Sequence, residues 1–256
     1  MGDDRFVGVF DSGVGGISIL KSLVAELPNE TFRFFGDSAH APYGDKPPEE
    51  VLRLSQSIVD TMVNDGAKAI VIACNTATSA AARSLRTTYS DIPIVGVEPA
   101  LKPATLAFPQ GRILVMATAV TLALEKFQRL AAQWGSGSQV IPVACVGLAD
   151  RIEQGNLEAD DMHELLLSLV GAYRGKVDAV VLGCTHYAFV KQQIRDILGH
   201  VTFFDSGAGT ARQLRRVLTE RGTLANADSQ GSVSFASSKD TEEELTLYRW
   251  FYRQEL

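Results

Sequence analysis

The chain has 256 residues, of which 46% are hydrophobic and 21% charged, the balance of an ordinary globular protein with one large or two modest domains. Its net charge of −6 argues against nucleic acid or an anionic membrane as a partner. No apolar run approaches the roughly 18–20 residues that a membrane helix needs, and the acidic start Met-Gly-Asp-Asp does not resemble a signal peptide. We therefore expect a cytoplasmic protein.

The first segment predicts a strand, a glycine-rich loop and a helix. Residues 5–10 form a short apolar run that ends in Asp11-Ser12-Gly13-Val14-Gly15-Gly16, and residues 17–27 then repeat apolar side chains at helical spacing. The loop lacks the G-x-G-x-x-G order and the G-K-[ST] ending of phosphate-binding loops. We expect a tight turn that uses the freedom of glycine at positive φ and presents Asp11 and Ser12.

Strands and helices alternate through the rest of the first half. The patterns predict strands at residues 31–35, 69–73 and 93–97, and helices at 47–65 and 75–88. Asn75 or Thr76 can cap the second of these helices, while Gly66 suits the end of the first. This alternation is typical of a parallel sheet with helices on its faces.

The alternation then restarts in the second half. The expected helices lie at residues 101–107, from 117 onward through Leu124, Phe127 and Leu130, at 159–173 and at 190–198; the expected strands lie at 112–116, 140–143, 179–182 and 201–204. The tail predicts a helix after Gly207, a strand at 232–236 and a last helix. A capping box at residues 241–244 opens that helix, and we expect Trp250 and Phe251 to pin it to a domain surface.

Short motifs recur between the two halves. Asp-Ser-Gly follows a predicted strand at residues 11–13 and again at 205–207, and a cysteine ends a predicted strand at Cys74 and again at Cys184. We interpret this as an internal pseudo-repeat. The predicted fold class is α/β, with two similar three-layer domains, mostly parallel sheets and a site in the cleft between the domains.

The paired cysteines are the strongest candidates for chemistry. Ligands bind at the carboxyl ends of strands in open α/β sheets, and a helix that starts just after a cysteine lowers the pKa of the thiol. Buried packing is the alternative, because free cysteine is among the most buried residue types. Two thiols in matching settings suit proton exchange on both faces of one carbon. Cys145 lacks polar neighbours and is expected to be structural, and the cysteine spacing predicts no metal site.

Asp11 and His186 are the candidate proton partners of the thiols, with a backbone cap and a buried core histidine as the alternatives. Small polar residues also follow the predicted strands, and helix capping explains any one of them. Together they would form a ring of neutral donors that suits a small carboxylate ligand. They are Ser12, Ser38, Asn75, Thr76, Thr118, Thr121 and Thr185.

Four motifs together carry a specific resemblance. Residues 9–16, Gly36-Asp37-Ser38 with Pro42-Tyr43-Gly44, Ala73-Cys74-Asn75-Thr76-Ala77 and Leu182-Gly183-Cys184-Thr185-His186 closely resemble the glutamate racemases, which belong to the cofactor-independent aspartate/glutamate racemase superfamily. The resemblance runs from about residue 7 to 207. It implies one domain of residues 1–98 plus 207–256 and a second of residues 99–206.

The resemblance also implies roles for residues of this chain. Cys74 and Cys184 would be the two catalytic acid/bases, Cys74 for D-glutamate with Asp11 assisting, and Cys184 for L-glutamate with His186 assisting. The substrate would be held by Asp11, Ser12, Tyr43, Gly44, Asn75, Thr76, Thr118, Thr121, Thr185 and His186. The implied product role is the supply of D-glutamate for peptidoglycan. No lysine stands at a strand-end motif, so a pyridoxal cofactor is not expected, and no other cofactor is.

Some positions depart from the family pattern. Leu124 and Phe127 stand where Ser and Tyr are often found, and Val146 and Ala188 stand where proline is common. These changes affect the second-domain wall of the site and contacts to an effector or within a possible homodimer. The alternatives are an aspartate or hydantoin racemase, an amino-acid-binding protein whose cleft closes without chemistry, and a cysteine hydrolase, although no nucleophile elbow is present.

Overall fold

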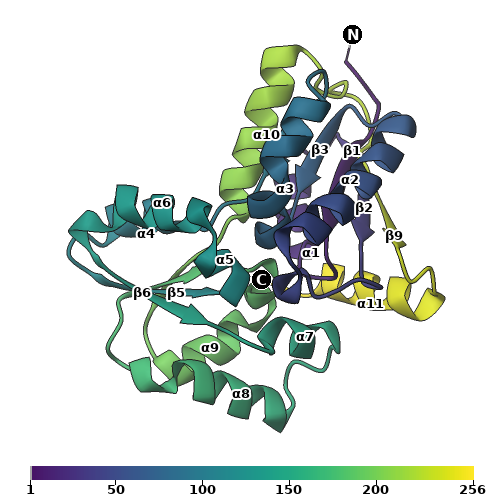
Figure 1. Cartoon of the computed structure of the whole chain (residues 1–256). Coiled ribbons are helices and arrows are strands. Elements are labelled where there is room, and N and C mark those ends of the chain that lie inside the picture. The colour runs from purple at the N-terminus through teal and green to yellow at the C-terminus, as the bar shows by residue number, and fades with distance from the viewer. Residues whose placement is uncertain (1) are drawn as a thin grey trace.

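The computed structural model describes residues 2–256, which form two sheets with helices packed against them (Figure 1). Every strand pair in both sheets is parallel. The first sheet has the order β4-β3-β1-β2-β9, with β1 (Val7–Asp11), β2 (Thr31–Gly36), β3 (Ala69–Ile72), β4 (Ile94–Gly96) and β9 (Ser232–Ser237). The second has the order β6-β5-β7-β8, with β5 (Arg112–Ala117), β6 (Gln139–Ala144), β7 (Ala179–Leu182) and β8 (Thr202–Phe204). The predicted α/β class is confirmed.

The two sheets repeat one topology. If β5, β6, β7 and β8 are matched in chain order to β1, β2, β3 and β4, both sheets read in the same strand order, and only β9 is extra. The strands that precede Cys74 and Cys184, β3 and β7, are therefore equivalent. The second Asp-Ser-Gly motif is different, because it follows β8, the counterpart of β4 and not of β1. Its similarity to residues 11–13 does not reflect an equivalent position in the repeat.

Helices connect the strands and cover the sheets. They are α1 (Ile17–Glu26), α2 (Pro48–Asn64), α3 (Asn75–Thr88), α4 (Leu101–Ala107), α5 (Ala119–Ala123), α6 (Glu125–Trp134), α7 (Leu148–Glu153), α8 (Asp160–Val170), α9 (Lys191–Leu198), α10 (Gly207–Arg221) and α11 (Glu242–Arg253). Helix α2 stops at Gly66, which has a φ of +90°, and the Thr241 hydroxyl caps α11 by accepting from the Glu244 amide.

Two helix predictions need correction, and one helix was missed. The single helix expected after residue 117 is interrupted at Leu124, whose extended backbone separates α5 from α6. The helix expected at 190–198 is preceded by a 3₁₀ turn, Thr185–Val190, which carries His186. Helix α7 was not predicted at all, because only Leu148 and Ile152 mark its short buried face.

The apolar core runs through both halves. One cluster joins Val9 and Ile17 of the first half with Leu114, Leu182 and Ile194 of the second. In α11, Phe251 is fully buried as expected, but Trp250 is 37% exposed and packs edge-on against Phe251. The tail therefore docks through one of the two aromatics that were predicted to pin it.

The chain passes between the sheets twice, once between β4 and β5 and once after β8, because β9 returns to the first sheet. The predicted domain boundaries near residues 98 and 207 lie in these two connections and stay predictions. Over residues 2–256, no helix has the length and apolar character needed to cross a membrane.

Candidate active site

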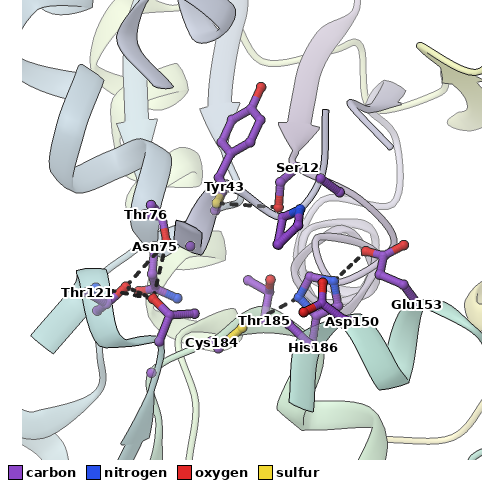
Figure 2. Close-up of a pocket in the computed structure, with 17 residues that line it drawn as sticks. Ser12, Tyr43, Asn75, Thr76, Thr121, Asp150, Glu153, Cys184, Thr185 and His186 are labelled. Atoms are coloured by element: carbon purple, nitrogen blue, oxygen red, sulfur yellow. Dashed lines mark hydrogen bonds and ion pairs between the residues drawn. The ribbon is translucent and has the colours of Figure 1, made fainter. Parts of the chain in front are cut away.

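A cavity of about 30 Å³ lies between the two sheets and is lined by residues of both halves. We call it the front cavity (Figure 2). All the predicted site residues except Asp11 line it, namely Ser12, Tyr43, Gly44, Cys74, Asn75, Thr76, Thr118, Thr121, Cys184, Thr185 and His186. Of the donors proposed from sequence, Ser38 lies elsewhere, because its hydroxyl pairs with the Tyr248 hydroxyl at 2.7 Å.

Cys74 stands at the junction of β3 and α3. It is itself the N-cap of α3, since its Sγ accepts from the Ala77 amide at 3.4 Å, a role that we had expected of Asn75 or Thr76. The thiol also lies 3.9 Å from the Ser12 hydroxyl. Burial and the nearby charge of Asp11 raise the pKa of Cys74 well above its ordinary value, so this thiol is held protonated.

Cys184 has a different partner. Its Sγ lies 3.5 Å from His186 Nδ1, and the other ring nitrogen, Nε2, lies 2.5 Å from Glu153 Oε1 (Figure 2). Burial alone would lower the pKa of His186. Cys184 and Glu153 raise this pKa by more than burial lowers it, so the pKa lies well above the ordinary value. The imidazole is therefore held as an imidazolium, which places a positive charge 3.5 Å from the Cys184 sulfur.

Asp11 lies behind the cavity wall and links the two halves. It is fully buried, and its carboxylate accepts from the Ser12 amide at 2.7 Å and from the Thr185 hydroxyl at 3.0 Å. Burial raises the pKa of Asp11 by more than the charge of His186 lowers it, so the pKa lies above its ordinary value. Asp11 thus acts on Cys74 through its charge and positions Ser12 and Thr185 by hydrogen bonds.

The glycine loop is needed for close approach, not for positive φ as we had expected. None of Gly13, Gly15 and Gly16 has a positive φ. A Cβ on Gly13 would lie 1.9 Å from Glu153 Oε1, and one on Gly15 would lie 2.4 Å from His186 Nδ1. The loop therefore lets the second-half acid and imidazole lie directly against the first half.

Hydroxyl groups gather on the opposite wall of the cavity. The Thr118 hydroxyl donates to the Thr121 hydroxyl at 2.9 Å, and the Thr76 hydroxyl lies 3.5 Å from both. Asn75 is 5% exposed, and neither its amide nitrogen nor its amide oxygen has a partner among the described residues. These groups are the available donors for a bound carboxylate.

Tyr43 and Gly44 enter the wall from a 3₁₀ turn, Tyr43–Asp45. Tyr43 is 1% exposed, and its hydroxyl donates to Asp37 at 2.6 Å. The hydroxyl thus points away from the cavity and the ring forms the wall (Figure 2). A Cβ on Gly44 would lie 3.3 Å from Thr118 Cγ2, so glycine permits this contact between the halves.

Two site residues were missed from the sequence, Asp150 and Glu153, and both come from the unpredicted helix α7. Glu153 Oε1 accepts from the Val14 amide at 2.8 Å as well as facing His186. The only sequence signal for this helix was the pair of apolar residues Leu148 and Ile152, four residues apart, beside the two acids. Burial, followed by the charge of Asp45, raises the pKa of Asp150.

The third thiol is buried outside the cavity, as predicted for a structural residue. Cys145 is 3% exposed, its Sγ faces the Val143 carbonyl oxygen at 3.6 Å, and burial raises its pKa to about 12. In the part of the chain that the structure describes, no group of three or more His, Cys, Asp and Glu side chains could hold a metal ion.

Comparison with known families identifies the family of the chain. The family model described as Asp/Glu/Hydantoin racemase matches residues 7–214. The chain belongs to this family. It is therefore a racemase, an enzyme of the isomerase class.

The chain is similar over nearly its whole length to proteins of known name. It is 45% identical over 243 residues to the glutamate racemase of Clostridium perfringens, which covers 94% of each chain, and 44% identical to that of Clostridium novyi, which covers 93% of each. Among solved structures, glutamate racemase from Thermus thermophilus in complex with beta-chloro-D-alanine superimposes with a TM-score of 0.81 at 33% identity, covering 97% of this chain and 93% of that one. Escherichia coli glutamate racemase in complex with L-glutamate and the activator UDP-MurNAc-ala gives a TM-score of 0.85 at 26% identity, covering 96% and 95%.

Proposed function

We propose that this racemase interconverts L- and D-glutamate by a two-base mechanism that uses Cys74 and Cys184. One observation carries the proposal: the two thiols end equivalent strands, β3 and β7, in opposite halves of the molecule, and both line the front cavity. Inverting a stereocentre requires that a proton leave one face of Cα and return to the other. One base would mostly return the proton to the face from which it came.

In the L-to-D direction, the Cys184 thiolate removes the α-proton. The Cα–H bond breaks, its electron pair stays on the substrate, and the proton becomes the S–H of Cys184. The Cys74 thiol then gives its proton to the opposite face of Cα and is left as a thiolate. The reverse direction starts from the Cys74 thiolate. The assignment of Cys184 to L-glutamate follows the family resemblance.

The partners of the two thiols support these starting states. The His186 imidazolium, held by the Glu153 carboxylate, places a positive charge beside the Cys184 sulfur. Burial and the charge of Asp11 raise the pKa of Cys74 and keep that thiol protonated. In the proposed L-to-D direction, Cys184 accepts a proton and Cys74 donates one.

The carbanion needs stabilisation from fixed donors. The Thr76, Thr118 and Thr121 hydroxyls, the free amide of Asn75 and the N-terminus of α3 all lie at the cavity wall. Pre-placed donors of this kind lower the energy of a developing negative charge without reorganisation. We propose that they hold the α-carboxylate, on which the charge of the deprotonated Cα is spread.

Glutamate is favoured over aspartate and hydantoins by the named relatives, which match at 44–45% identity along the chain. The Picrophilus torridus aspartate racemase, at 13% identity and a TM-score of 0.58, shares the fold alone. A panel of L- and D-amino acids and hydantoins, followed by circular dichroism, tests the choice. Faster inversion of aspartate or a hydantoin than of glutamate would contradict it.

The mechanism is tested with Cys74→Ser, Cys184→Ser and Cys145→Ser. We expect the first two to lose racemisation and Cys145→Ser to keep it, because Cys145 lies outside the front cavity. Deuterium uptake at Cα in D₂O separates this mechanism from a pure binding protein, which would give none. Racemisation by Cys74→Ser at the wild-type rate would show that the two-thiol mechanism is wrong.

The cellular role follows from the proposed reaction. We propose that the product, D-glutamate, supplies peptidoglycan synthesis in the cytoplasm and so supports the cell wall and cell shape.

The expected independence of cofactors is tested by adding pyridoxal phosphate, which should not change the rate. The possible homodimer stays a prediction, which sedimentation would test.

A further inference from the structure

A second cavity lies behind the first and shares part of its wall. It has a volume of about 280 Å³, compared with about 30 Å³ for the front cavity, and we call it the rear cavity. Asn75, Cys184 and Thr185 line both cavities, whereas Cys74 lines only the front one. Ala188 and Ala208 are among the other residues of the rear wall.

The wall shared by the two cavities holds an unsatisfied polar group. Asn75 is 5% exposed, and both ends of its amide lack a hydrogen-bond partner among the described residues. A buried amide without partners is costly, and such groups in native proteins are satisfied by ordered water or by a ligand. A polar cavity needs only about 10–15 Å³ to hold one water molecule. The rear cavity is far larger, and Lys191, Asp205 and Ser206 make its wall polar.

We propose that the rear cavity is a hydrated passage through which the Cys184 thiol exchanges its proton with solvent during turnover. The inference rests on the proposed two-thiol reaction. After Cys184 has taken the α-proton, the S–H bond breaks, its electron pair stays on sulfur and the proton passes to water. The reverse step, from water to sulfur, places a solvent hydron on Cys184.

The passage makes the two thiols unequal in solvent access. A bound substrate fills the narrow front cavity and excludes water from it, which prevents leakage of protons by that route. Cys184 still borders the rear cavity, but Cys74 does not. A proton taken from L-glutamate by Cys184 therefore exchanges readily, whereas a proton taken from D-glutamate by Cys74 tends to return to the substrate.

The experiment follows deuterium in D₂O at low conversion. Chiral separation and mass spectrometry are applied to the reaction from each starting enantiomer. The measured quantity is a ratio, the amount of deuterium gained by the recovered substrate divided by the amount of product formed. Two variants fill the rear cavity, Ala208→Leu at the exposed start of α10 and Ala188→Leu in the buried 3₁₀ turn. We expect both to lower this ratio at least about threefold from L-glutamate and to leave it unchanged from D-glutamate.

A matched control is Thr219→Leu, which adds a similar side chain to the exposed face of α10 away from the rear cavity. It should leave both ratios unchanged. The inference is overturned if neither cavity-filling variant changes the ratio, or if the ratio falls equally from both enantiomers. A wild-type protein that neither racemises glutamate nor exchanges its α-proton would instead overturn the proposed function.

Discussion

The imidazole of His186 lies 2.5 Å from the carboxylate of Glu153, on the side of the ring opposite to Cys184. The same Glu153 oxygen accepts from the Val14 amide of the first half, 139 residues away in sequence. One carboxylate therefore fixes the charge of the imidazole and joins the two halves beside the site.

We predict that Glu153→Gln lowers kcat/KM for glutamate by about 10- to 100-fold, since a hydrogen bond to a charged group contributes about 1.5–3 kcal/mol. Glu153 raises the pKa of His186, so its loss lowers that pKa. If activity requires the imidazolium, the high-pH limb of the rate profile moves to lower pH. Glu158→Gln is the control, because it makes the same change at an exposed carboxylate, one that accepts from Gln193. An unchanged rate and pH profile in Glu153→Gln would contradict the role.

We predict that Asp11→Asn makes Cys74 easier to alkylate. Burial and the charge of Asp11 both raise the pKa of Cys74. Removing the charge lowers that pKa, although burial keeps it above the ordinary value, and the thiolate fraction at mildly alkaline pH increases. Peptide mass spectrometry after iodoacetamide treatment measures the rate, with buried Cys145 as the internal reference. Slower labelling of Cys74 in the variant would be inconsistent with this electrostatic relationship.

We predict opposite results for two glycine-to-alanine changes. Gly15→Ala places a Cβ 2.4 Å from His186 Nδ1, so we expect a loss of about 1–3 kcal/mol in unfolding free energy and at least about 10-fold in kcat. Gly209→Ala lies inside α10 with open space at its Cβ and should stabilise the protein by up to about 1 kcal/mol. Urea unfolding and racemisation assays give both values. Wild-type activity in Gly15→Ala would show that the glycine loop can shift to make room for the added methyl group, and would contradict the prediction.

We predict that Lys68→Met destabilises the protein by about 3–5 kcal/mol, because it leaves Glu30 as an unpaired buried charge. The two side chains are at most 2% exposed and lie 2.6 Å apart. Lys46→Met removes a partly exposed pair with Glu50 and should cost less than about 1 kcal/mol. Equal unfolding midpoints in urea for the two variants would refute this difference. Adding Glu30→Gln to Lys68→Met should recover part of the loss.

Much of the fold follows from local sequence signals. Buried parallel strands appear as continuous apolar runs, so β3 and β7 were predicted almost to the residue, together with the cysteines that follow them. The break at Leu124 and the short helix α7 could not be predicted. The first depends on one backbone angle, and the second has a single turn of buried face, which is too short for a periodic signal.

The site was predictable where polar residues follow strands, and not where contacts cross between the halves. Ser12, Asn75 and Thr185 line the cavity as expected. Glu153 was missed because its role depends on His186, 33 residues later, and on the missing side chains of Gly13 and Gly15. A sequence pattern cannot show that two glycines are required by close packing against a distant helix.

The two thiols stand at equivalent places in the repeated topology, but their partners carry opposite charge, Asp11 beside Cys74 and His186 beside Cys184. Mirror-image molecules have equal free energy in an achiral solvent. Detailed balance therefore requires that kcat/KM be the same for the two enantiomers, even though the two sides of the site differ. The charge difference can appear only as parallel changes in kcat and KM, so the enantiomer with the higher kcat must also have the higher KM.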